Sequence, residues 1–76
     1  RLRIYPNPSQ DEILVEVEGD IGESTLEIHR IDGVKMANYT LKGRQEVIDI
    51  SRIPQGAYIL TLNRGTRIYR STLIKQ

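Results

Sequence analysis

The sequence IDISRIPQGAYILTL, residues 48–62, decides the fold of this chain. Apolar and polar residues alternate over 48–51, which is the period of a strand with one buried face. Pro54 has no backbone donor and fixes its own φ, so it ends the ladder. Gly56 can adopt the positive φ that a tight turn often needs, and alternation resumes at Tyr58. The stretch therefore predicts a strand, a tight turn and a second strand.

Ile53 stands just before the proline of this turn. An isoleucine caught between turn residues is expected to tuck beneath the turn and close the end of the core. We therefore interpret Ile53, Pro54, Gly56 and Tyr58 as mainly structural residues that build the turn and the core.

The rest of the chain repeats the pattern of short alternating segments separated by turn residues. Strands are predicted at residues 2–5, 12–18, 24–31, 34–41, 45–50, 57–62 and 67–75. No window shows apolar residues at the helical spacing i, i+3, i+4 and i+7. This pattern predicts an all-β fold, a small antiparallel Ig-like or Greek-key β-sandwich of about seven strands.

Three turn regions carry specific predictions. Pro6, Asn7 and Pro8 cannot lie inside a ladder, so residues 6–8 are expected to form a rigid turn or an extended polyproline-like link. Asp32 and Gly33 are the preferred pair for a two-residue type I′ hairpin. The alternation changes phase after this hairpin, which predicts a bulge near residues 37–38. A further hairpin turn is expected at residues 63–66.

The composition describes one small domain, residues 1–76, with no cysteine, tryptophan or phenylalanine. The formal net charge is +1, but it is unevenly distributed. Residues 1–38 hold four basic and eight acidic side chains, a net −4, and residues 39–76 hold seven and two, a net +5. One interpretation is that acidic and basic strands pair across a sheet and cancel. The alternative is a basic face used for docking.

Catalytic and metal-binding motifs are not recognisable in this sequence. His29 is the only histidine and is expected on the exposed face of a strand, with no serine–carboxylate context around it. One histidine without cysteine does not suit zinc, and no metal or cofactor is predicted. A domain of this size also fills its interior with side chains. We expect no enzyme and no nucleic-acid partner, and we expect function on an edge strand, a loop or a terminus.

Several motifs together resemble the type A C-terminal sorting domain of the type IX secretion system. The resemblance rests on Tyr-Pro-Asn-Pro at 5–8, Asp-Gly-Val-Lys at 32–35, the stretch 48–58 and Leu-Ile-Lys-Gln at 73–76, and it spans essentially the whole chain. Ile53 stands where the family usually has leucine. The basic residue after Gly33 is displaced by one position, which weakens any role for Lys35.

The resemblance implies a non-catalytic address for a larger cargo. In this family the domain is read in the periplasm and at the outer membrane, where it directs the cargo through the translocon. An outer-membrane shuttle and a sortase-like peptidase are the implied partners, and the peptidase typically removes the domain. The cargo then reaches the cell surface or is secreted. The read-out residues would be Leu73, Ile74, Lys75 and Gln76. The chain lacks an initial methionine, so we expect a C-terminal piece of a cargo protein.

Two other functions are left open by the sequence. An adhesive or carbohydrate-binding accessory module could use exposed tyrosines such as Tyr39 and Tyr69 as a sugar platform. A small hydrolase would require a polar cleft around His29. Exposed strand edges also permit β-augmentation by a partner, or a strand-swapped homodimer.

Overall fold

The computed structural model describes residues 2–19 and 22–76, which form seven strands and no helix. The strands are β1 (Leu2–Tyr5), β2 (Glu12–Val17), β3 (Ser24–Arg30), β4 (Lys35–Leu41), β5 (Gln45–Asp49), β6 (Gly56–Arg64) and β7 (Arg67–Lys75). Every predicted strand is confirmed, with ends that differ by at most two residues. A membrane-spanning helix is accordingly not found in this described part of the chain.

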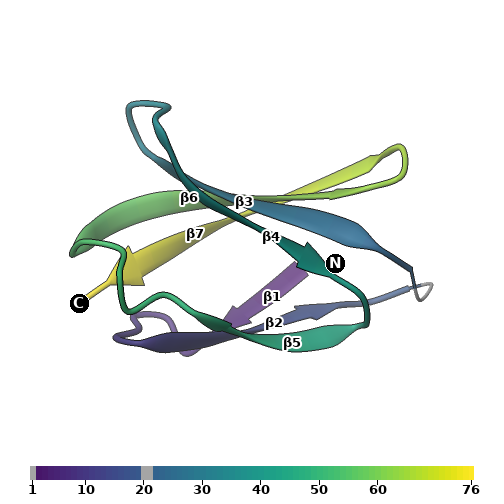
Figure 1. Cartoon of the computed structure of the whole chain (residues 1–76), viewed down its shortest axis with the longest axis horizontal. Helices are drawn as coiled ribbons and strands as arrows, with labels where there is room; N and C mark the ends of the chain where they lie inside the picture. The colour runs from purple at the N-terminus through teal and green to yellow at the C-terminus, as the bar shows by residue number, and fades with distance from the viewer. Residues whose placement is uncertain (1, 20–21) are drawn as a thin grey trace.

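Two antiparallel sheets pack face to face, as Figure 1 shows. One sheet has the order β1-β2-β5 and the other the order β4-β3-β6-β7. Strand β5 returns beside β2 and β6 returns beside β3, which is the return connection typical of Greek-key sandwiches. The predicted sandwich is confirmed. At one side of the sandwich β1 lies close to β7 without a ladder between them.

The core consists of the apolar residues that alternate along the inner faces of both sheets. Its buried members are Ile13, Val15, Val17, Leu26, Ile28, Leu41, Ile48, Ile50, Ile53, Tyr58, Leu60, Leu62 and Leu73. Branched aliphatic residues suit a pleated, half-buried surface, and here they supply most of the buried volume. At about 1–3 kcal/mol for each fully buried side chain, this layer is the main stabilising contribution.

The turn between β5 and β6 has the predicted structure. Ile53 is 7% exposed, and its backbone N–H donates to the carbonyl of Ile50 at 3.0 Å. The Tyr58 hydroxyl donates to the carbonyl of Pro54, so one ring both fills the core and fastens the turn. A Cβ at Gly56 would lie 3.8 Å from the Tyr58 ring. The turn and the first residues of β6 therefore form one packed unit.

The hairpin between β3 and β4 differs from the prediction. A type I′ turn needs positive φ at both central residues, yet no described residue other than glycine has positive φ. Instead, the Gly33 N–H donates to the Arg30 carbonyl, and Gly33 follows this turn with φ +96°. Asp32 accepts hydrogen bonds from the Arg30 side chain and from the Val34 N–H. These bonds hold Asp32 in an ordinary conformation, so the type I′ prediction is wrong.

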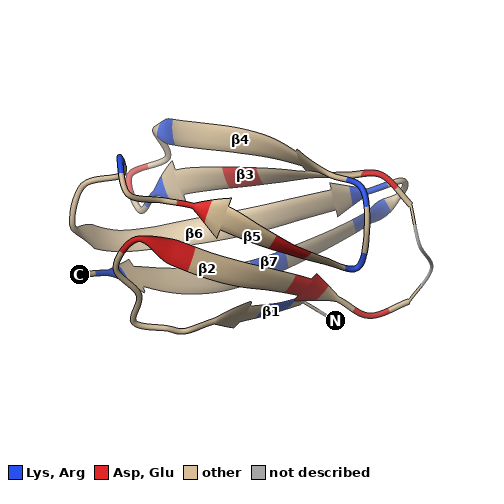
Figure 2. Ribbon diagram, turned by 60° about the horizontal axis from the view of Figure 1, so that its bottom comes forward, with Lys and Arg blue, Asp and Glu red and all other residues tan. Residues whose placement is uncertain are grey.

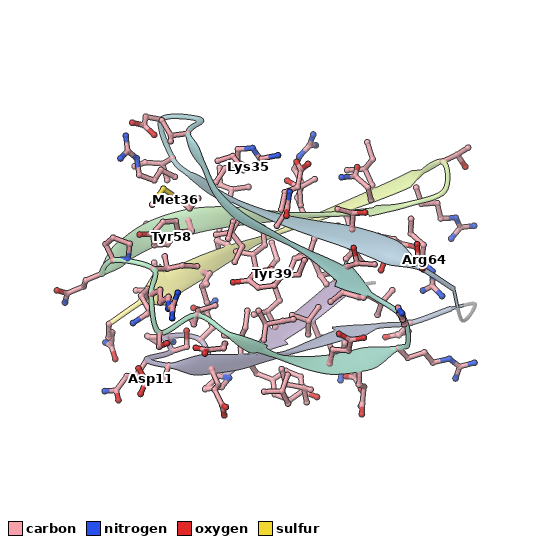
Figure 3. The ribbon with its side chains drawn as sticks, viewed as in Figure 1. Asp11, Lys35, Met36, Tyr39, Tyr58 and Arg64 are labelled. Atoms are coloured by element: carbon pink, nitrogen blue, oxygen red, sulfur yellow. The ribbon has the colours of Figure 1, made fainter. Side chains whose placement is uncertain are left out.

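The predicted bulge exists, one residue before the expected position. Ile28 pairs with Ala37 and His29 pairs with Lys35, which leaves Met36 as the extra residue of β4. This insertion restores the phase in which Tyr39 and Leu41 face the core. Tyr39 points from β4 toward the other sheet, and its hydroxyl donates to the Asp49 carbonyl at 3.1 Å (Figure 3). The bond closes the side of the sandwich formed by β4 and β5. At the opposite hairpin, β6 extends two residues further than predicted and shortens the turn to Gly65 and Thr66, whereas β7 has the predicted bounds.

The charges segregate by sheet instead of cancelling across it. Glu12 lies directly opposite Asp49 in the β2–β5 ladder, and Arg64 lies opposite Arg67 in the β6–β7 ladder. Figure 2 shows acidic segments on β2 and β5, and basic segments along β7. Acidic and basic residues pair as predicted only where Arg3 lies opposite Glu16 in the β1–β2 ladder. In the β2–β5 and β6–β7 ladders the prediction is wrong, because residues of like charge became neighbours. The chain has an acidic sheet and a basic pair of strands.

Candidate functional site: the edge of the last strand

Strand β7 presents its final residues alternately to the core and to solvent. Leu73 is fully buried and Lys75 is 7% exposed, whereas Ile74 is 43% exposed and Gln76 is exposed. Lys75 buries its aliphatic stem, and its ammonium donates to the Gln76 carbonyl at 3.5 Å. Of the four residues predicted as a read-out segment, Ile74 and Gln76 are thus accessible to a partner, and Leu73 and Lys75 hold the segment in place.

The outer edge of this segment is occupied by residues 7–9, which we call the clamp. The Asn7 side chain donates from Nδ2 to the Thr72 carbonyl at 3.0 Å. The same side chain accepts from the Ile74 N–H at Oδ1 at 2.9 Å. One side-chain amide therefore satisfies a donor and an acceptor of the strand edge, as a neighbouring strand's peptide group would.

Ser9 continues the clamp with its backbone. Its N–H donates to the Ile74 carbonyl at 2.9 Å, and its carbonyl accepts from the Gln76 N–H at 2.7 Å. Ser9 forms a parallel bridge with Lys75 and is itself 2% exposed. Together the four bonds extend the four-stranded sheet by a short parallel segment along residues 72–76. An edge that would otherwise invite another strand is closed there.

The Tyr-Pro-Asn-Pro motif is part of the sandwich. The Tyr5–Pro6 and Asn7–Pro8 peptide bonds are cis, and residues 6–8 bend against β7 after β1 has joined its sheet. Of the two predicted alternatives for residues 6–8, the turn is therefore confirmed and the extended link is wrong. The motif instead carries the chain from the edge of one sheet to the edge of the other.

The motif Ile-Pro-Gln-Gly-Ala-Tyr at residues 53–58 flanks residues 73–76 from the opposite side. Gly56 pairs with Lys75 and Ala57 pairs with Ile74 in the β6–β7 ladder. The last residues of β7 therefore lie between the clamp and the start of β6. The two sequence motifs, separated by more than forty residues, meet on either side of residues 73–76. Asp32 and Gly33 are not part of this arrangement and form the β3–β4 hairpin.

Sequence reasoning did not identify Ser9 or Thr72 as site residues, although both make clamp bonds. Ser9 contributes only main-chain groups, so its side-chain type carried no signal. The usable signal was the asparagine between two prolines, because an amide held at a bend can replace a peptide group of a missing strand.

Asp32, Asp49 and Tyr39 have shifted pKa values, and all three lie outside the clamped edge of β7. The hydrogen bond from the Arg30 side chain lowers the pKa of Asp32 to about 2, and the Val34 N–H adds to this effect. The hydrogen bond from Ser51 lowers the pKa of Asp49. Burial raises the pKa of Tyr39, with a further contribution from Asp49. These are the effects of hairpin and turn geometry on single groups.

The alternative functions find little geometry to support them. Tyr39 and Tyr69 are partly buried and pack against the core, so neither is an exposed platform for a sugar. His29 is partly exposed on the outer face of β3, with its Nε2 4.0 Å from a Glu27 oxygen. Two open surface hollows in the described chain lie near Gly19; Tyr69 lines one of them, and His29 lines neither. The described residues also contain no cluster of three metal-ligating side chains.

Comparison with known proteins assigns this sandwich to a family. The family model described as the secretion system C-terminal sorting domain matches residues 3–76. The chain belongs to this family, the sorting domains of type IX secretion. A search of curated proteins gave no match. Domains of this family act as export signals that bring an upstream cargo, through the type IX machinery, across the outer membrane to the surface or the medium.

Proposed function

We propose that residues 1–76 form a single, non-catalytic sorting domain whose read-out surface is the clamped end of β7. The observation that carries this proposal is the position of residues 73–76 between the two family motifs. The clamp and β6 fix the backbone of this segment on both sides, so the outward side chains of Ile74 and Gln76 are held in one orientation. A preorganised surface loses less conformational entropy when a receptor binds it.

In this proposal the cargo passes through the periplasm before the machinery at the outer membrane reads the domain. An outer-membrane shuttle contacts Ile74 and Gln76, and a sortase-like peptidase then removes the domain. Residues Leu73 and Lys75 act indirectly, because their side chains face inward and position their neighbours. Pro6, Pro8, Ile53, Pro54 and Tyr58 serve the same positioning role from further away.

The test uses a full-length cargo that ends in this domain, in a host with type IX secretion. Deleting residues 74–76 is expected to trap the cargo in the periplasm with its upstream domain folded. Because deletion also removes three of the four clamp bonds, a gentler variant is needed. Ile74→Asp changes an exposed side chain and leaves the backbone bonds of the clamp intact.

Ile68→Asp is the matched control, since Ile68 is 57% exposed on the same outer face of β7 and lies away from the clamp. We expect surface delivery to fall for Ile74→Asp and to persist for Ile68→Asp. Equal delivery of both variants at the wild-type level would refute a read-out role for Ile74. Removal of the domain is followed separately, by the loss of its mass from delivered cargo. Delivery of uncleaved cargo would refute the peptidase step alone.

A further inference from the structure

An exposed apolar row crosses the outer face of the β1-β2-β5 sheet. The ladders place Tyr5 opposite Leu14, and Leu14 opposite Val47. Tyr5 and Val47 are 40% and 63% exposed, and Leu14 is partly exposed. At the usual strand spacing the row is about 10 Å long. Neither the core nor the proposed read-out surface uses it.

Carboxylates border this row on both sides. Glu12 and Asp49 lie opposite each other on one side, and Glu16 lies on the other, where Arg3 is opposite it with 4.0 Å between Arg3 Nη1 and Glu16 Oε1. Among the described residues, the acidic end of the row without an ion pair is therefore the one at Glu12 and Asp49. Glu16 accepts hydrogen bonds from Tyr5 and Gln45. An apolar centre with an acidic border is a surface that suits a partner with an apolar side chain next to a cation.

The outer face of β7 has the complementary pattern. Ile68 is 57% exposed, and Arg70, two residues later, is exposed on the same face. Strands β6 and β7 contain no acidic residue within their bounds. Residues two apart on a strand are about 6.6 Å apart, so the step from Ile68 to Arg70 equals the step from Leu14 to Glu12.

We propose that the outer face of β7 in one copy packs on the outer face of the β1-β2-β5 sheet in a second copy. Ile68 covers the row at Leu14 and Val47, and Arg70 lies between Glu12 and Asp49. The two surfaces differ, so the contact is head-to-tail and leaves one free surface of each kind on every dimer. Copies therefore add in series.

The size of the face sets the strength of this contact. Three strands about 4.8 Å apart and four to six residues long cover roughly 250 Å², well below the ~800 Å² per partner of a standard interface. Association is therefore weak and sensitive to salt, and it becomes substantial only at high local concentration.

Sedimentation equilibrium of the purified chain tests the proposal. From about 20 μM to about 1 mM at low salt, the weight-average mass is expected to rise continuously beyond that of a dimer, and to fall again at about 0.5 M salt. Arg70→Glu should weaken association about three- to tenfold. Lys35→Glu, the same change of charge at an exposed position on β4, at the far edge of the sheet from β7, should leave it unchanged.

Exchange of charges gives the sharper test. Glu12→Lys and Arg70→Glu should each associate poorly alone, and their mixture should recover association because each now fits the other. A monomer at about 1 mM in low salt would overturn the proposal, as would equal effects of Arg70→Glu and Lys35→Glu. A mass that saturates at two copies and ignores both charge reversals would indicate a strand-swapped dimer instead. None of these measurements depends on secretion, so they can fail without affecting the sorting proposal.

Discussion

Asn7→Ala removes the two side-chain bonds of the clamp and leaves the Ser9 bonds in place. Each net hydrogen bond contributes about 0.5–1.5 kcal/mol, and here water can solvate the released groups because Asn7 is exposed. We therefore expect a loss of about 1–2 kcal/mol in the free energy of unfolding. In a domain of this length that loss lowers the thermal midpoint by roughly 5–15 °C.

Thermal unfolding followed by circular dichroism measures this loss, and hydrogen exchange locates it. The Ile74 amide donates to Asn7, so its exchange should accelerate more than that of amides inside the β3–β6 ladder, which accelerate only as far as the global loss of stability dictates. Asn38→Ala is the control, since Asn38 is exposed on β4 and makes no side-chain hydrogen bond in the described structure. Equal midpoints for the two variants, with Ile74 still protected, would refute the clamp as a source of stability.

Further predictions concern the turns. Ile53→Ala should cost about 2–4 kcal/mol, measured by urea unfolding, because it empties the space beneath the β5–β6 turn. Gly33→Ala should destabilise by about 1 kcal/mol or more because φ is +96° there, and Gly43→Ala, at ordinary φ with open space around it, should be neutral or slightly stabilising. The pKa of Asp32 is lower in the folded chain, at about 2, than in the unfolded chain. Its contribution to stability is therefore complete above about pH 4 and disappears as the pH falls toward 2; in Arg30→Gln, an NMR titration of Asp32 should return toward the ordinary value.

Local sequence carries enough information for the strands and for the β5–β6 turn. The alternation of apolar residues marks which face of each strand is buried, and this signal does not depend on knowing the partner strand. Ile53 and Tyr58 were predictable for the same reason, since proline and glycine fix the turn around them. The phase change in β4 similarly indicated a bulge, although the ladder was needed to place it at Met36.

Features that depend on distant partners were not predictable. Glu12 lies opposite Asp49 because β5 returns beside β2, and a single sequence does not state which strands become neighbours. The clamp joins Asn7 to Thr72 and Ile74, which follow it by 65 and 67 positions in the chain, so no local pattern indicates the clamp. The prediction of a type I′ turn at Asp32 was wrong for a different reason. Its side chain bonds to Arg30 and Val34, and these bonds favour a turn that the residue pair alone does not specify.

The clamp also imposes an order on assembly. Residues 7–9 are synthesised near the start of this stretch, but they have no strand to bind until residues 72–76 follow. A chain that lacks residues 74–76 can still pack its two sheets together. The edge of β7 then stays open, because the Ser9 carbonyl has no Gln76 N–H to accept from. Closure of this edge therefore requires that residues 72–76 are present, so a receptor that binds the closed edge would not bind a chain that stops before them.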